Sequence, residues 1–185
     1  MEDNFFKPIK ETRTLLDADF YPTLEPKEAV YDQLGDVVVV APDGPQSGKG
    51  HAITIDGILR ADSIKIDDGP QEEFSCSGTP ADCVKLAVNV VLKRKPDLLV
   101  SGINHGSNSS INVIYSGTMS AAVEGSLENI PSIGFSLCDF SWEADFEPAA
   151  PFIKKIAEKV LDEGLPRGVC LNVNIPKKTN EAYKG

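Results

Sequence analysis

Four short, mostly apolar runs mark the chain, at residues 37–40, 97–101, 132–136 and 169–175. The first is an unbroken series of four valines. Such runs are typical of strands that helices cover on both faces, as in a parallel sheet. The sequence therefore predicts four buried strands.

Between these strands, apolar residues recur at helical spacing. One helix is predicted to begin after Thr79, because threonine caps helices, Pro80 suits the first helical position and Asp82 suits the first turn. Two more helices are predicted from Thr118 onward and over residues 151–161. Strands that alternate with helices predict βαβ units joined by right-handed crossovers.

Three other segments complete the predicted architecture. The helix after Thr79 is expected to end at the basic segment 93–96, and a further helix is expected over residues 26–34. Residues 56–76 alternate instead and carry turn residues at 67–70, which predicts a β-excursion. We therefore expect a Rossmann-like three-layer αβα fold with a mainly parallel sheet, as a single domain over residues 1–185.

Composition narrows the class of protein. The formal net charge of -10 argues against a nucleic-acid polymer or an anionic membrane as partner, because both reward clustered Lys and Arg. No apolar run approaches the roughly 20 residues that span a bilayer, and residues 1–13 resemble neither a signal nor a transit peptide. We therefore expect a cytoplasmic protein. Four cysteines without a C-x-x-C pair and two histidines argue against a zinc site or a disulfide framework, so the cysteines are predicted to be core or near-core residues.

In parallel sheets covered by helices, ligands bind beyond the carboxyl ends of the strands. This rule points to three loops, at residues 41–51, 102–118 and 136–146. The first loop contains Ser-Gly-Lys-Gly at residues 47–50, whose backbone N–H groups are able to meet an anion, although its spacing is not that of a Walker A motif. The alternative for this loop is an ordinary surface loop with a mobile lysine.

The second loop is crowded with amide and hydroxyl side chains and runs directly into the helix predicted from Thr118. Free N–H groups at a helix N-terminus, together with hydroxyls and a glycine, form a natural phosphate site. Alternatively, Ser116 or Thr118 is simply the helix cap, and the two interpretations are compatible. His105 in the same loop is not expected to bind a metal, and a role in acid–base chemistry stays open.

Five segments in this order resemble the SurE family of 5′(3′)-nucleotidases. They are V-V-A-P-D-x-x-x-S-G at 39–48, G-T-P-x-D-C-V at 78–84, R-K-P-D-L-L-V-S-G-I-N-x-G-x-N at 94–108, I-Y-S-G-T-x-x-A-A-x-E-G at 114–125 and L-N-V-N-I-P at 171–176. The resemblance is clear over residues 36–176, whereas residues 1–35 diverge. Five ordered motifs are far more specific than any single glycine-containing loop.

The resemblance implies a SurE-like fold and hydrolysis of nucleoside 5′-monophosphates with Mn²⁺ or Mg²⁺. Carried over position by position, it implies that Ser47 and Asn104 contact the metal. It further implies that the substrate phosphate is held by Asn108, Ser116, Gly117 and Thr118. No catalytic residue is assigned. Members of the family form homo-oligomers.

The sequence departs from the family pattern in two places. The Asn-Asp-Asp-Gly tetrapeptide, whose aspartates are the family's anionic metal ligands, is absent, and Asp17 or Asp19 is the candidate replacement. The chain also stops at Gly185, before the strands and the oligomerising arm with which the family continues, so we expect a partial member. The first hypothesis is therefore a metal-dependent nucleotidase. The alternative is a catalytically impaired fragment that keeps the phosphate-binding loop, and a purely structural domain ranks last.

Overall fold

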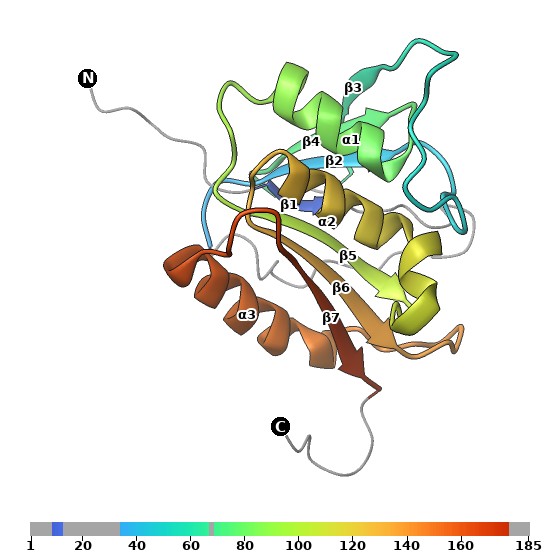
Figure 1. The fold of residues 1–185 in the computed structure, drawn as a ribbon, viewed down its shortest axis with the longest axis vertical. Coiled ribbons are helices and arrows are strands. Elements are labelled where there is room, and N and C mark those ends of the chain that lie inside the picture. Colours follow the sequence, from blue (N-terminus) through green and yellow to red (C-terminus); the bar gives the residue numbers. More distant parts are fainter. Residues whose placement is uncertain (1–8, 13–33, 67–68, 178–185) are drawn as a thin grey trace.

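The computed structural model describes residues 9–12, 34–66 and 69–177, and strands in two hydrogen-bonded sheets form its middle layer (Figure 1). The larger sheet has the order β1-β5-β6-β7, and all of its neighbouring strands are parallel. Its strands are β1 (Ile9–Thr12), β5 (Leu99–His105), β6 (Ser132–Cys138) and β7 (Cys170–Pro176). The last three confirm the strands predicted at 97–101, 132–136 and 169–175.

The smaller sheet has the order β2-β4-β3 and lies beside β1 (Figure 1). β2 (Val38–Pro42) is parallel to β4 (Glu72–Cys76), which pairs in antiparallel fashion with β3 (Ala61–Ile64). The valine run is therefore a buried strand, as predicted. The β3–β4 pair confirms the β-excursion over 56–76, although residues 67 and 68 of its predicted turn lie outside the described residues.

Helices cover both faces of this layer, which confirms the three-layer αβα fold (Figure 1). The side chains of consecutive residues at the start of β5 point alternately to the two faces of the sheet, so each face contributes to a core with its own helices. Leu98 and Val100 pack in one core with α3 (Ala150–Glu163), whereas Leu99 packs in another with residues of α1 (Pro80–Leu86) and α2 (Gly117–Leu127). Both cores contain fully buried aliphatic side chains.

The helix boundaries follow the predicted signals at their N-termini. Thr79 caps α1 through a reciprocal pair with Asp82: the Asp82 N–H donates to Thr79 Oγ1 at 3.2 Å, and the Thr79 N–H donates to Asp82 Oδ2 at 2.9 Å. The predicted C-terminal boundary is confirmed, because helical turns continue through Val91 and the chain leaves the helix at Leu92, directly before the basic segment. The helix type differs from the expectation, since the turns after Leu86 form a π-helix, Ala87–Val91.

Cys76 and Cys83 are buried and Cys138 and Cys170 are partly buried, which agrees with the predicted core or near-core placement. The predicted helix at 26–34 lies almost entirely outside the described residues, and so do Asp17 and Asp19. Within the described ranges, no helix is both long enough and apolar enough to cross a membrane.

Candidate functional site

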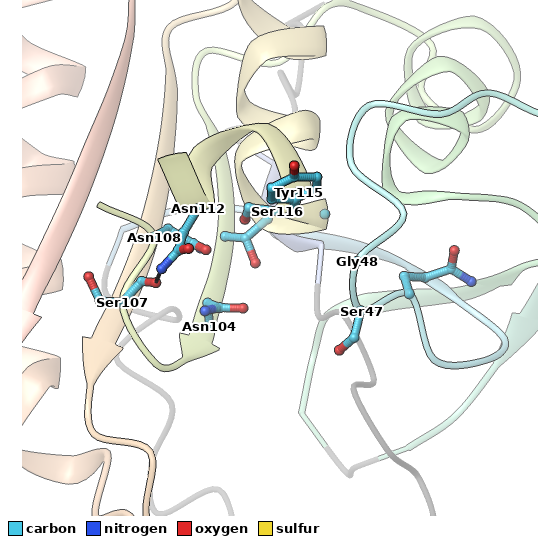
Figure 2. Close-up of a pocket in the computed structure, with 11 residues that line it drawn as sticks. Ser47, Gly48, Asn104, Ser107, Asn108, Asn112, Tyr115 and Ser116 are labelled. Atoms are coloured by element: carbon cyan, nitrogen blue, oxygen red, sulfur yellow. Dashed lines mark hydrogen bonds between the residues drawn. The ribbon is translucent and has the colours of Figure 1, made fainter. Parts of the chain in front are cut away.

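A cavity of about 180 Å³ opens at the carboxyl ends of β2 and β5, between the loops at 41–51 and 102–118 (Figure 2). It is lined by Gln46, Ser47, Gly48, Asn104, Ser107, Asn108, Asn112, Tyr115, Ser116, Gly117 and Thr118. Two of the three loops picked by the strand-end rule therefore form the cavity, and loop 136–146 supplies none of its lining. The six site residues suggested by the resemblance all line it, although this placement does not test their roles.

Gly50 allows the backbones of the two loops that line the cavity to approach each other closely. The Gly50 N–H donates to the Tyr115 carbonyl oxygen at 3.2 Å, and a Cβ on Gly50 would lie 2.5 Å from the Ile114 carbonyl oxygen. The φ of Gly50 is +57°, a conformation that favours glycine. Glycine at this position is therefore required by a close contact between backbones.

A buried carboxylate on α2 holds the end of the first loop. Glu124 is only 4% exposed, yet it lies 2.8 Å from His51 Nε2 and 2.5 Å from Lys85 Nζ. Burial alone raises the pKa of Glu124, but the hydrogen bonds from Lys85 and His51 outweigh it and leave this pKa below its usual value. The charged carboxylate thereby links the loop that carries Ser47 to both α1 and α2.

The second loop is fastened to the sheet by two asparagines of β7. Asn172 and Asn174 are two residues apart, so their side chains leave the strand on the same side. The Asn174 Oδ1 accepts from the Asn108 N–H at 2.8 Å, and the Asn172 Nδ2 donates to the Asn108 carbonyl oxygen at 2.9 Å. The Asn108 Nδ2 in turn donates to Ser136 Oγ at 2.9 Å. Asn108 thus positions the loop, and its amide keeps one further N–H for a ligand.

The N-terminus of α2 forms one end of the cavity. Ser116 caps the helix, with its Oγ accepting from the Met119 N–H at 3.1 Å, so the N–H groups of Gly117 and Thr118 have no intrahelical acceptor. The Thr118 hydroxyl is buried and has no hydrogen-bond partner among the described residues. Free N–H groups, the positive end of the helix dipole and a free hydroxyl together suit an anion such as phosphate.

The unpartnered hydroxyl allows a clean test of this arrangement. Thr118→Val should leave the free energy of unfolding unchanged or raise it by about 1 kcal/mol. The reason is that it replaces a buried hydroxyl that makes no hydrogen bond with the described residues. The same change should weaken binding of inorganic phosphate about tenfold or more, as expected for loss of a hydrogen bond to a charged group. Chemical denaturation and calorimetric titration measure the two quantities.

Ser101 provides the matched control for this test. Its hydroxyl is also buried and without a partner in the described part of the chain, but Ser101 does not line the cavity. Ser101→Ala should therefore leave phosphate binding unchanged. Equal phosphate affinities for Thr118→Val and the unsubstituted protein would contradict a ligand role for the Thr118 hydroxyl.

Oxygen atoms suited to a hard cation gather at the other end of the cavity. The Asn104 Nδ2 donates to the carbonyl oxygens of His105 and Gly106 at 3.2 and 2.8 Å, which leaves its Oδ1 for a ligand. Figure 2 shows this oxygen and the Ser47 hydroxyl facing the same space. Amide and hydroxyl oxygens are ligands that Mg²⁺ and Mn²⁺ accept.

The anionic part of such a ligand set is not among the described residues. No carboxylate lines the cavity there, and the described ranges contain no group of three or more His, Cys, Asp or Glu able to hold a metal. Asp17 and Asp19, the candidate replacements, lie outside these ranges. The described residues therefore fit the neutral half of a divalent-cation site.

The structure places His105 away from the cavity. Its Nε2 donates to the Ser141 carbonyl oxygen at 2.7 Å, and its ring meets Phe146 edge-on, with 6.0 Å between the ring centroids. The histidine joins the end of β5 to the loop after β6. The acid–base role that the sequence left open thus receives no support from this arrangement.

Two cavity residues escaped the sequence analysis. Gln46 is buried, its Nε2 donates to the Gly44 carbonyl oxygen at 3.0 Å, and its Oε1 has no partner among the described residues. Tyr115 lines the cavity but is largely exposed. The only indication in the sequence was that each residue directly precedes a predicted site residue, Gln46 before Ser47 and Tyr115 before Ser116.

Comparisons with known proteins agree on one family. A family model described as Survival protein SurE matches residues 22–185, and so begins within the divergent N-terminal segment. The 5′-nucleotidase SurE of Flavobacterium johnsoniae is 66% identical over 157 residues, which is 85% of this chain and 61% of that protein. The 5′-nucleotidase SurE of Flavobacterium psychrophilum is 64% identical over 157 residues, with the same coverage.

Solved structures agree with the sequence relatives. The crystal structure of the SurE protein from Aquifex aeolicus matches with a TM-score of 0.71 and 45% identity, covering 80% of this chain and 58% of that one. The chain therefore spans about three fifths of the length of the proteins it matches.

Proposed function

The chain belongs to the SurE family, and from this membership we propose that it hydrolyses nucleoside 5′-monophosphates with the help of a divalent cation. The relatives that match over most of this chain are named 5′-nucleotidase SurE. The observation that carries the proposal is the cavity in which the N-terminus of α2 faces the oxygens of Ser47 and Asn104 (Figure 2). It combines a phosphate site with part of a cation site.

The phosphate is proposed to lie against the N-terminus of α2. There the N–H groups of Gly117 and Thr118 and the Thr118 hydroxyl are available as donors. They are fixed before the substrate arrives, because the Ser116 cap and the surrounding core set the first turn of the helix. Preorganised donors stabilise charge that develops on phosphoryl oxygens in the transition state without the cost of reorientation.

The cation is proposed to lie near Ser47 and Asn104. A divalent cation, when bound, supplies positive charge and polarises the phosphoryl group. The contribution of the chain is orientation: the Asn104 amide nitrogen is tied to backbone carbonyls, so its oxygen stays directed at the cavity. The proposal also requires a carboxylate, for which Asp17 and Asp19 are the candidates, since charged ligands set much of the affinity for such cations.

The decisive experiment measures phosphate release from 5′-AMP by the full chain in the presence of Mn²⁺, Mg²⁺ or EDTA. Release that depends on the cation and stops with EDTA is the expected result. A folded sample that releases no phosphate under any of these conditions would overturn the proposal.

A second candidate function is a nucleotide-binding module without turnover. It is favoured by one observation from the sequence, the absence of the Asn-Asp-Asp-Gly tetrapeptide whose aspartates are the family's anionic metal ligands. Binding of 5′-AMP that EDTA does not weaken, combined with no phosphate release, would identify this function. The same sample of protein serves both measurements.

A further inference from the structure

An aromatic side chain lies exposed at the rim of the cavity. Tyr115 is 58% exposed although aromatic rings usually contribute to cores, and it directly precedes the Ser116 cap. It is also one of the residues that line the cavity, and Figure 2 shows its ring beside Ser116. The ring therefore borders the place where the phosphate is proposed to bind.

The size of the cavity decides which part of a nucleotide it can enclose. Its volume of about 180 Å³ is well below the roughly 300–1,000 Å³ of sites that enclose whole drug-sized ligands. This volume is ample for a phosphate and small for a complete nucleoside monophosphate. With the phosphate held at α2, the base extends toward the open side of the cavity.

The short helix that carries Tyr115 bears two more exposed apolar side chains. Ile111 and Ile114 of η2 (Ser110–Tyr115) are 63% and 57% exposed, but neither lines the cavity. The other described residues that line the cavity are polar or glycine, so Tyr115 is the one large ring among them. The η2 helix leads directly into the N-terminus of α2, which places this ring next to the phosphate site.

The backbone that carries the ring is held in place. The Tyr115 carbonyl oxygen accepts the Gly50 N–H at 3.2 Å, and the Ser116 N–H donates to the Val113 carbonyl oxygen at 3.3 Å. Only the side-chain torsions of the tyrosine remain to be ordered when a ligand binds. A preorganised ring costs little entropy to use as a contact surface.

We propose that Tyr115 is the stacking platform for the base of the nucleotide, an inference that rests on the proposed function. Every nucleobase presents a π-face, so a ring that stacks accepts purines and pyrimidines alike. Among the described residues, Phe140, Trp142 and Phe152 are further exposed aromatic side chains, and none of them lines the cavity. Phe140 lies near the end of β5, since a Cβ on Gly106 would stand 2.4 Å from its ring. Tyr115 is therefore the residue that the geometry favours.

The test compares the dissociation constants of 5′-AMP and ribose 5-phosphate, which differ by the base. Tyr115→Ala should weaken binding of 5′-AMP between about 5-fold and 100-fold, the usual effect of removing one stacking partner. It should leave binding of ribose 5-phosphate within about twofold. Tyr115→Phe should retain the affinity for 5′-AMP, because the ring and not the hydroxyl provides the contact. Leu127→Ala removes a comparably exposed apolar side chain at the far end of α2 and should change neither constant.

Each contrary outcome has a distinct meaning. Equal loss of affinity for both ligands in Tyr115→Ala would overturn stacking in favour of a general effect on the cavity. A larger selective loss in Phe140→Ala would assign the base to the other aromatic ring. Equal binding of both ligands by the unsubstituted chain would show that the base makes no contact, while the proposed function stands. Failure of the unsubstituted chain to bind either ligand would overturn the proposed function as well.

Discussion

Replacing Asn104 by alanine is expected to lower the catalytic efficiency of metal-dependent phosphate release at least about 100-fold. Loss of groups that merely orient metal ligands already costs about 10- to 100-fold, and Asn104 is proposed to be a ligand itself. Its Oδ1 faces the cavity because its Nδ2 donates to the carbonyl oxygens of His105 and Gly106. The alanine variant loses the oxygen and the two hydrogen bonds together.

Asn104→Asp separates these two losses. Aspartate keeps an oxygen at the position, but a carboxylate has no N–H to donate to the two carbonyl groups, so the side chain loses its orientation. We expect activity between that of the alanine variant and that of the unsubstituted chain. The measurement is kcat/KM for 5′-AMP over a series of Mn²⁺ concentrations.

Asn89→Ala is the matched control for this prediction. The Asn89 Nδ2 also donates to a backbone carbonyl, that of Lys85 at 2.8 Å, but Asn89 lies on η1 (Ala87–Val91) and does not line the cavity. Activity should be unchanged in this variant. Unchanged kcat/KM and unchanged metal dependence in Asn104→Ala would remove Asn104 from the site.

The largest expected effect on stability is that of Gly102→Ala. Gly102 lies within β5 at φ +110°, and a Cβ there would stand 2.3 Å from the carbonyl oxygen of Phe135 on the neighbouring strand. The pairing of β5 with β6 changes register between Ser101 and Asn104, so Gly102 lies in the irregularity that carries the strand into the cavity. An alanine therefore meets both an unfavourable φ and a backbone atom that cannot move without disturbing the sheet.

We expect this substitution to lower the free energy of unfolding by about 3 kcal/mol or more, as the sum of backbone strain and overpacking. For a chain of this size, that corresponds to a fall in Tm of roughly 6–12 °C. Thermal and urea-induced unfolding provide the measurement. Gly44→Ala is the control, because nothing lies within 4 Å of its added Cβ. A Gly102→Ala variant as stable as Gly44→Ala would refute the steric argument.

Local chemistry made much of the fold predictable. Three features depend only on residues that are close in the sequence, and each favours one local structure. They are the valine run of β2, the apolar stripe of α3 and the Thr79-Pro80 start of α1. The rule for strand ends then directed attention to the loops at 41–51 and 102–118, which do form the cavity. Ser116 as cap of α2 is a further local property, since its hydroxyl meets the N–H of Met119 three residues ahead.

Other features of the site depend on partners far apart in the sequence. Glu124 is the only charged residue of α2, and nothing near it in the sequence shows that it contacts His51 and Lys85. His105 was an open candidate for acid–base chemistry until its contact with the Ser141 carbonyl placed it beside another loop. Neither contact leaves a local pattern.

The sequence by itself determined the strands β2, β5, β6 and β7, the Thr79 cap of α1 and three candidate loops, whereas β1 and the choice of two loops came from the structure. Only the tertiary structure decided which hydroxyls and amides remain without partners inside the cavity, as for Thr118 and Gln46, and which ring is left exposed at its rim, as for Tyr115. The physical reason is the sequence distance over which the interactions act. Helix caps and strand patterns arise from neighbouring residues, whereas burial and hydrogen-bond satisfaction are set by everything that packs around a group.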